Sequence, residues 1–193
     1  MTPRLTYTSH RRRVLRSGAL CLVLALAGLA FGLPALDRAL PADRPVPSDR
    51  PYAVGGGVTV VPPPGSRIDV TGTRPTDDAG TVLFRLGPVR YLITVRRFDG
   101  DLSAAALGLR QRITGTGGYQ VTGTELMVAT GSGLAGRQGG YTAPGRGGRY
   151  AVFVTGGRTI EVTVSGADLD LGRTLPAIDA STRTLHYEPA QPR

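Results

Sequence analysis

The chain of 193 residues has a formal net charge of +9, and all of its 23 basic residues are arginines. Arginine does not alternate with aromatic residues as it does on nucleic-acid-binding surfaces, so the sequence predicts no nucleic-acid partner. Cys21 is the only cysteine, which excludes an intrachain disulfide. After an N-terminal segment and a linker, roughly 140 residues remain, enough for one domain that folds without a metal or disulfide.

Residues 17–36 form an uncharged apolar run, SGALCLVLALAGLAFGLPAL. As a helix rising 1.5 Å per residue, this run would span about 30 Å, the thickness of a bilayer core. Residues 1–16 contain five arginines and no acidic residue. The positive-inside rule therefore predicts a cytoplasmic basic tail, one transmembrane helix and an extracytoplasmic C-terminal domain, which makes this a single-pass protein of the cell membrane.

A cleaved signal peptide is the alternative for the same segment. Small residues at 28–30 or 30–32 could form a cleavage site, and residues 11–16 resemble a twin-arginine export signal. Both interpretations place the rest of the chain outside the cytoplasm. Residues 37–53 contain four prolines and balanced charges, which predicts an extended tether between the membrane and the domain.

The domain is expected at residues 54–187. Gly55 to Gly57 open it, followed by strands over 58–61, 67–71, 81–86 and 89–96. A helix is predicted over 102–113, where apolar residues recur at helical spacing and Asp101 can cap the first turn.

Strands are then predicted over 119–129 and 134–142, followed by a hairpin of 149–155 and 158–164 joined by a two-glycine turn. Alternation in the last strand predicts a buried apolar face and a wet face carrying Glu161. A second helix is expected on the apolar stripe from Leu171 to Leu185. Asp168 or Asp170 is expected to cap it, and its regular part should start near Leu175 because Pro176 disfavours helix before it. Residues 188–193 form a tail, with fraying expected from Tyr187. This order predicts an α+β fold with an antiparallel sheet and two main helices.

These elements resemble the PsbP-like α/β/α sandwich of actinobacterial LpqN-type lipoproteins and type VII secretion-associated extracytoplasmic domains. The resemblance lies in the opening strand VTVVPPPG at 58–65, the first helix after a hairpin, Gly140-Tyr141, the hairpin at 150–164 and the closing stripe at 175–185. Ser66 follows Gly65 where many relatives carry tryptophan. The arginine- and glycine-rich composition also indicates a GC-rich bacterial genome. The resemblance implies a binding or accessory module without catalytic residues.

Motifs for chemistry are weak. The sequence from Gly131 to Gly136 fits G-x-G-x-x-G, but no helix can follow it, so a hairpin loop is the favoured interpretation. His10 and His186 are the only histidines, and His186 is expected to be solvated near the C-terminus. The aspartate pairs 77/78, 99/101 and 168/170 are explained by turns and helix caps, with weak calcium binding at 99/101 as the alternative. We therefore predict no catalytic residue, metal or cofactor.

Four arginines lie in or near glycine-rich loops around the late hairpins, and guanidinium groups suit phosphate or carboxylate partners. Arg137, Arg146, Arg149 and Arg158 are the candidate binding residues, the alternative being an ordinary solvated surface. The expected function is a membrane-anchored extracytoplasmic binding or accessory module of the cell envelope, linked to secretion. Its expected partner is an envelope protein or an anionic envelope polymer. The rival hypothesis is an exported hydrolase with an unfamiliar site.

Overall fold

The computed structural model describes residues 43–189. The predicted basic tail, the transmembrane segment and the start of the tether lie outside these residues, as do the last four. Within residues 43–189, no helix combines the length and the apolar character needed to cross a bilayer.

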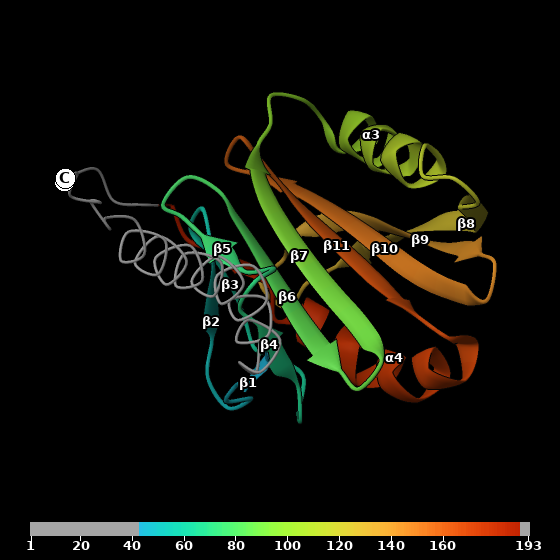
Figure 1. Ribbon diagram of the computed structural model, residues 1–193. Helices are drawn as coiled ribbons and strands as arrows, with labels where there is room; N and C mark the ends of the chain where they lie inside the picture. The colour runs from blue at the N-terminus through green and yellow to red at the C-terminus, as the bar shows by residue number, and fades with distance from the viewer. Residues whose placement is uncertain (1–42, 190–193) are drawn as a thin grey trace, which may run out of the picture. The chain divides into compact units, whose positions relative to one another are not determined.

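Nine of the strands in the described residues belong to one antiparallel sheet, ordered β1-β4-β6-β7-β11-β10-β9-β8, with β5 paired to β6 (Figure 1). Its strands are β1 (Asp43–Pro45), β4 (Arg67–Asp69), β5 (Arg74–Pro75), β6 (Gly80–Leu86), β7 (Val89–Arg97), β8 (Gln120–Ala129), β9 (Ala135–Ala143), β10 (Arg146–Thr155) and β11 (Arg158–Gly166). A small second sheet contains β2 (Tyr52–Gly55), β3 (Val58–Val60) and β12 (His186–Tyr187). Glycines with positive φ at positions 156 and 157 form the predicted two-residue turn between β10 and β11.

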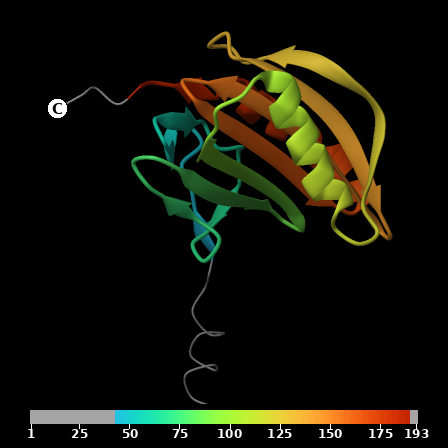
Figure 2. The same cartoon turned by 90° about the horizontal axis from the view of Figure 1, so that it is seen from above.

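Helices α3 (Leu102–Thr114) and α4 (Asp168–Arg183) lie on opposite faces of the main sheet (Figures 1 and 2). Helix α3 contacts β8, β9 and β10, whereas α4 contacts β7, β10 and β11. As predicted, the Asp101 carboxylate caps α3 by accepting a hydrogen bond of 2.7 Å from the Ala104 amide. The α+β prediction, with two helices and a large antiparallel sheet, is confirmed.

Strand alternation divides the core between two faces. On the inner face, below α4, the buried side chains of the central strands meet Leu171 and Ile178 of the helix and Val58 of the small sheet. The central strands contribute Val82, Phe84, Tyr91, Ile93, Val95, Ile160, Val162 and Val164. On the outer face, Tyr150 and Val152 of β10 pack beneath α3.

The predicted tether is shorter than expected. Residues Asp43–Pro45 form β1, which pairs with β4 at the edge of the main sheet, where proline costs no ladder hydrogen bond. Tyr52 begins β2, and its ring packs edge-on against Phe84 with centroids 5.7 Å apart. Strand β2 was not predicted, because its apolar residues are few and interrupted. Its hairpin with β3 turns through three glycines of positive φ.

Three predictions near the C-terminus were wrong. Helix α4 begins at Asp168, seven residues before Leu175, and continues through Pro176. The carbonyl that proline leaves without a partner belongs to the exposed Gly172, where water can reach it, while Leu171 and Ile178 anchor the helix on the sheet. Neither predicted aspartate caps the helix; the N-cap is Ala167, which makes no side-chain cap bond. Tyr187 is not frayed, because β12 pairs with β3.

The open half of the outer sheet face

Helix α3 covers only part of the outer face. Strands β8, β9 and β10 lie beneath it and form the covered half, while β4, β6 and β7 form what we call the open half. The side chains of the open half alternate with those of the inner core. On β7 the outward residues are Arg90, Leu92, Thr94 and Arg96; the two arginines are exposed, and Leu92 and Thr94 are half-buried. Apart from Leu92 and the buried Leu83, which stands opposite it on β6, the open half therefore carries polar and basic side chains where the covered half is apolar.

Three arginines of the open half lie in one row across neighbouring strands. Arg67 of β4 is directly opposite Arg85 of β6, and Arg85 is directly opposite Arg90 of β7. Opposed residues of an antiparallel pair project from the same face with Cβ atoms about 5 Å apart. Like charges in this arrangement are destabilising. We call these three residues the arginine row.

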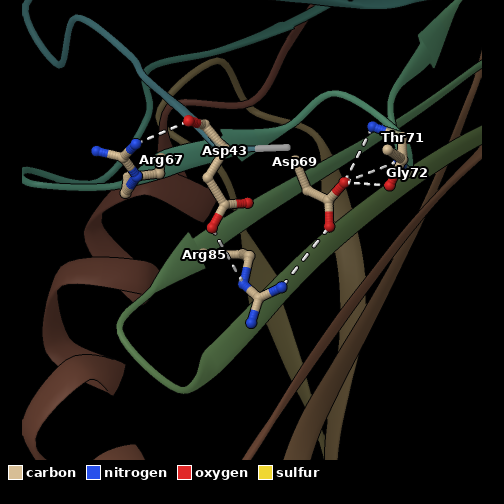
Figure 3. A network of polar contacts seen from close by, with 6 residues as sticks. All are labelled: Asp43, Arg67, Asp69, Thr71, Gly72 and Arg85. Atoms are coloured by element: carbon tan, nitrogen blue, oxygen red, sulfur yellow. Dashed lines mark hydrogen bonds and ion pairs between the residues drawn. The ribbon is translucent and has the colours of Figure 1, made fainter. Parts of the chain in front are cut away.

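Two carboxylates lie beside the arginine row (Figure 3). Arg85 Nε is 3.7 Å from Asp43 Oδ2, and Arg85 Nη1 is 3.8 Å from Asp69 Oδ2. These are ion-pair distances, too long for hydrogen bonds. Arg67 donates instead to the backbone carbonyl of Asp43 at 2.7 Å. Among residues 43–189, no carboxylate lies within 4.0 Å of a charged nitrogen of Arg90.

Asp69 is mainly committed to its own turn. Its Oδ1 accepts hydrogen bonds from the Thr71 hydroxyl at 2.6 Å, the Thr71 amide at 3.0 Å and the Gly72 amide at 3.1 Å (Figure 3). The Thr71 hydroxyl, the two amides and Arg85 lower the pKa of Asp69 below its ordinary value, although burial opposes them. Because Oδ1 is held by the turn, Asp69 contacts the arginine row only through the long ion pair of Oδ2 with Arg85.

Glu161 lies at the boundary between the two halves. It was predicted on a wet face but is only 7% exposed, because arginines from two elements close over it. Its Oε2 is 2.5 Å from Nη2 of Arg96 on β7, and its Oε1 pairs with Nη2 of Arg112 on α3. The ion pairs link the C-terminal part of α3 to the central strands, so Glu161 has a structural role.

The structure does not bring the four predicted arginines together. Arg137 lies on the outer face, where it donates to Ser103 of α3, whereas Arg149 lies on the inner face. Arg146 and Arg158 lie at opposite ends of the β10–β11 hairpin. Strand β10 has ten residues, so the two ends of the hairpin are about 30 Å apart. A loop cluster in the sequence is therefore spread over two faces and two ends of the sheet.

Three of these arginines also have carboxylate partners. Arg149 Nη1 is 2.5 Å from Asp179 Oδ2 of α4, and Arg137 Nη1 is 3.4 Å from Glu125 Oε2. Arg158 donates to the Asp78 carbonyl and lies 3.5 Å from its carboxylate. Asp179 and Asp78 come from distant parts of the sequence, whereas Glu125 lies on β8, the strand that pairs with β9 of Arg137. The binding role predicted for the four residues is not tested by this geometry and stays a prediction.

A small cavity of about 220 Å³ lies between the C-terminal part of α4 and strands β8, β9 and β10. It is lined by Val128, Ala129, Thr130, Gln138, Phe153, Asp179, Thr182 and Arg183. Neither His186 nor an aspartate pair is among the lining residues. The arrangement of base and nucleophile that the hydrolase hypothesis requires is not assembled in this cavity.

The other candidates for chemistry have structural positions. His186 is exposed on β12, and the glycine motif begins in the turn that joins β8 to β9. Asp168 and Asp170 lie in the first turn of α4, and Asp78 pairs with Arg97 and Arg158. In the described part of the chain, no three His, Cys, Asp or Glu side chains are grouped so that they could hold a metal ion.

No protein-family model matches the sequence, and no curated protein matches it. The structure is similar to the solution structure of cyanobacterial PsbP (CyanoP) from Synechocystis sp. PCC 6803, with a TM-score of 0.53. The fold is PsbP-like. The similarity covers 75% of this chain and 95% of the cyanobacterial one at 16% identity, so it concerns the fold alone. It confirms the PsbP-like part of the predicted resemblance, while the LpqN-type and actinobacterial assignments stay predictions.

The arginine row was missed by sequence analysis. Alternation with apolar residues does indicate that Arg85 and Arg90 each face away from the core. It does not indicate that they face each other, because that depends on the register between β6 and β7. Arg67 joins them only through the pairing of β4, a strand of three residues.

Proposed function

We propose that this protein is a membrane-anchored, extracytoplasmic binding module of the cell envelope that acts without catalysis. The observation that carries the proposal is the open half of the outer sheet face. Helix α3 leaves it uncovered, and Leu92 and Thr94 lie half-buried among arginines there. A sheet face with apolar and basic side chains on a rigid scaffold is suited to recognition of a partner.

The charge of this face favours an anionic envelope component as the partner. The open half and its borders carry six arginines against three carboxylates. The arginines are Arg67, Arg74, Arg85, Arg90, Arg96 and Arg112, and the carboxylates are Asp43, Asp69 and Glu161. Such an excess attracts anions and weakens with salt, because exposed charges are screened over about 8 Å at physiological ionic strength. A role in secretion, suggested by the predicted resemblance, is the narrower form of this proposal.

Membrane anchoring rests on the apolar run at 17–36 and its arginine-rich N-terminal flank. The absence of catalysis is supported by the positions of the candidate groups: His186 is exposed on β12 and does not line the cavity beside α4. The aspartates at 78, 101, 168 and 170 occupy ion pairs or helix N-termini. Turnover of an ester or glycoside by the purified chain would favour the hydrolase hypothesis instead.

The proposal is tested in cells with the full chain. A reporter fused after Arg193 should be active only outside the cytoplasm, and the protein should stay in carbonate-washed membranes at its full mass. A photoreactive benzoyl-phenylalanine replacing Leu92 should form adducts with an envelope component. The same probe at the exposed Thr124 of β8 is the control and should form none. A reporter active only inside the cell, or equal adducts at both positions, would contradict the proposal.

A further inference from the structure

We propose that the arginine row, Arg67, Arg85 and Arg90, is a binding site for the phosphate of an anionic membrane lipid. The inference rests on the proposed anchoring and names the chemistry that the open half recognises. The register of the adjacent strands β4, β6 and β7 places one arginine from each strand on the same face. Arg67 is opposite Arg85, and Arg85 is opposite Arg90.

The protein itself neutralises this row only in part. The two nearby carboxylates both approach Arg85, at 3.7 and 3.8 Å, without forming a hydrogen bond to it. Among the residues described, Arg90 has no carboxylate within ion-pair distance, and Arg67 donates only to a backbone carbonyl. Opposed like charges raise the energy of the unliganded sheet. An anion placed above the row would remove this repulsion.

The shape of the row favours phosphate over carboxylate. The three strands span about 10 Å, so the long arginine side chains from both sides can reach a group held over the central strand. A phosphate offers more oxygens than a carboxylate and accepts paired N–H donors from several guanidinium forks at once. Asp43 and Asp69 flank Arg85 and hold its guanidinium over the sheet (Figure 3). The local excess of one positive charge suits a phosphodiester, which carries one negative charge.

The position of the row in the chain favours a lipid as the source of the phosphate. Asp43 lies next to the row and follows the end of the predicted membrane segment, residue 36, by only seven residues. An extended chain covers at most about 3.5 Å per residue, so this edge of the domain stays within about 25 Å of the membrane surface. The early formation of β1, in place of the long tether expected from the sequence, makes this distance short.

Docking can be measured on the full chain in lipid nanodiscs. Cys21 is replaced by serine, and a fluorophore is attached to cysteine at Val70, which is 40% exposed beside β4. A quencher on the lipid headgroup then reports whether this edge lies on the surface. Quenching should be strong with phosphatidylglycerol and weak with phosphatidylcholine. Replacing all three arginines by glutamine should lower the ratio of docked to undocked molecules about 100-fold, since each arginine near an anionic surface contributes about 1 kcal/mol.

Two further variants make the test specific. The first is a control in which glutamine replaces three arginines outside the row, Arg110, Arg173 and Arg183. It loses the same net charge as the row variant, and its docking should persist. Arg90→Gln alone removes no ion pair within residues 43–189, so its partial loss of docking cannot come from a broken native contact. Equal quenching in both lipids, or an unchanged row variant, would overturn the proposal.

The source of the phosphate and the dependence on anchoring are separated by two measurements. If soluble glycerol phosphate binds while phosphatidylglycerol does not hold the domain, the lipid assignment is wrong. If the chain does not insert, the proposed anchoring fails, and the same variants are compared by adding the protein to preformed vesicles of the two lipids. Adducts at position 92 together with docking that is unchanged in the row variant would show that the binding module stands and the phosphate site does not.

Discussion

The two halves of the outer sheet face are built from the same strand geometry and carry opposite chemistry. Beneath α3, Tyr150 and Val152 of β10 are fully buried. On β7, two strands away, none of the outward residues is fully buried. Arg90 and Arg96 are exposed, and Leu92 and Thr94 are half-buried. The covering helix makes the difference, since alternation in each strand provides an outward residue whether or not anything covers it. In this protein one half of the outer sheet face therefore has no covering helix, while the other half stabilises the fold.

Glu161 lies at the boundary between these halves and connects them through ion pairs. Its carboxylate joins Arg112 from the helix to Arg96 from the open side. A glutamate buried to this extent requires paired charges, because an unpaired carboxylate would be costly to desolvate. Arg96 and Arg112 each remain about half exposed, so they can still contribute to the positive charge of the open face.

The largest expected effect is a difference in stability between a core variant in the covered half and a variant in the open half. Replacing Tyr150 by alanine should lower the free energy of unfolding by about 3–5 kcal/mol, as for other large aromatic residues in a core. Leu92→Ala, in the open half, should cost about 1 kcal/mol, because Leu92 is only half-buried. Urea denaturation of both variants measures the difference. Tyr150→Phe is the control, as it removes only the hydroxyl that donates to Glu125 at 2.8 Å. Equal costs for the two alanine variants would show that α3 does not distinguish the halves.

A smaller effect is expected at the boundary. Glu161→Gln removes the charge that both arginines contact and should cost about 1–2 kcal/mol, a value reduced because both partners are half exposed to solvent. Thermal and urea unfolding at low and high salt provide the measurement. Arg173→Gln, which breaks an exposed pair within α4, should change stability by less than about 0.5 kcal/mol. A Glu161 variant as stable as this control would mean that the boundary pairs contribute nothing.

The smallest effect concerns Asp69, beside the arginine row. Because folding lowers its pKa, the stability that it contributes is present above the ordinary pKa of about 4 and is lost as pH falls through the folded value. Asp69→Asn should therefore be less stable than the parent at pH 7, and the two should converge below about pH 4. Urea midpoints at several pH values test this, with the exposed Asp99→Asn as the control. A gap that stays constant down to pH 3 would contradict the expectation.

Local signals in the sequence were good predictors where neighbouring residues determine the structure. The Asp101 cap, the start of α3 at Leu102 and the two-glycine turn after Thr155 all occur as predicted. Strands β1 and β12 were missed because each has three residues or fewer and is held by a partner far away in the chain, and β2 because its apolar residues are few. Pro176 was given too much weight, since packing of Leu171 and Ile178 on the sheet outweighs a local preference.

By itself, the sequence determined which residues face away from the core, because alternation and helical spacing are properties of one segment. It also determined the arginine-rich, histidine-poor chemistry from which any site must be built. The tertiary structure decided which outward residues meet. Register placed Arg67, Arg85 and Arg90 side by side, and the position of α3 left them uncovered. The same pairing rules sent Arg137 and Arg149 to opposite faces. A shift of one residue between strands reverses every side chain, so proximity on a sheet depends on long-range pairing that no single segment encodes.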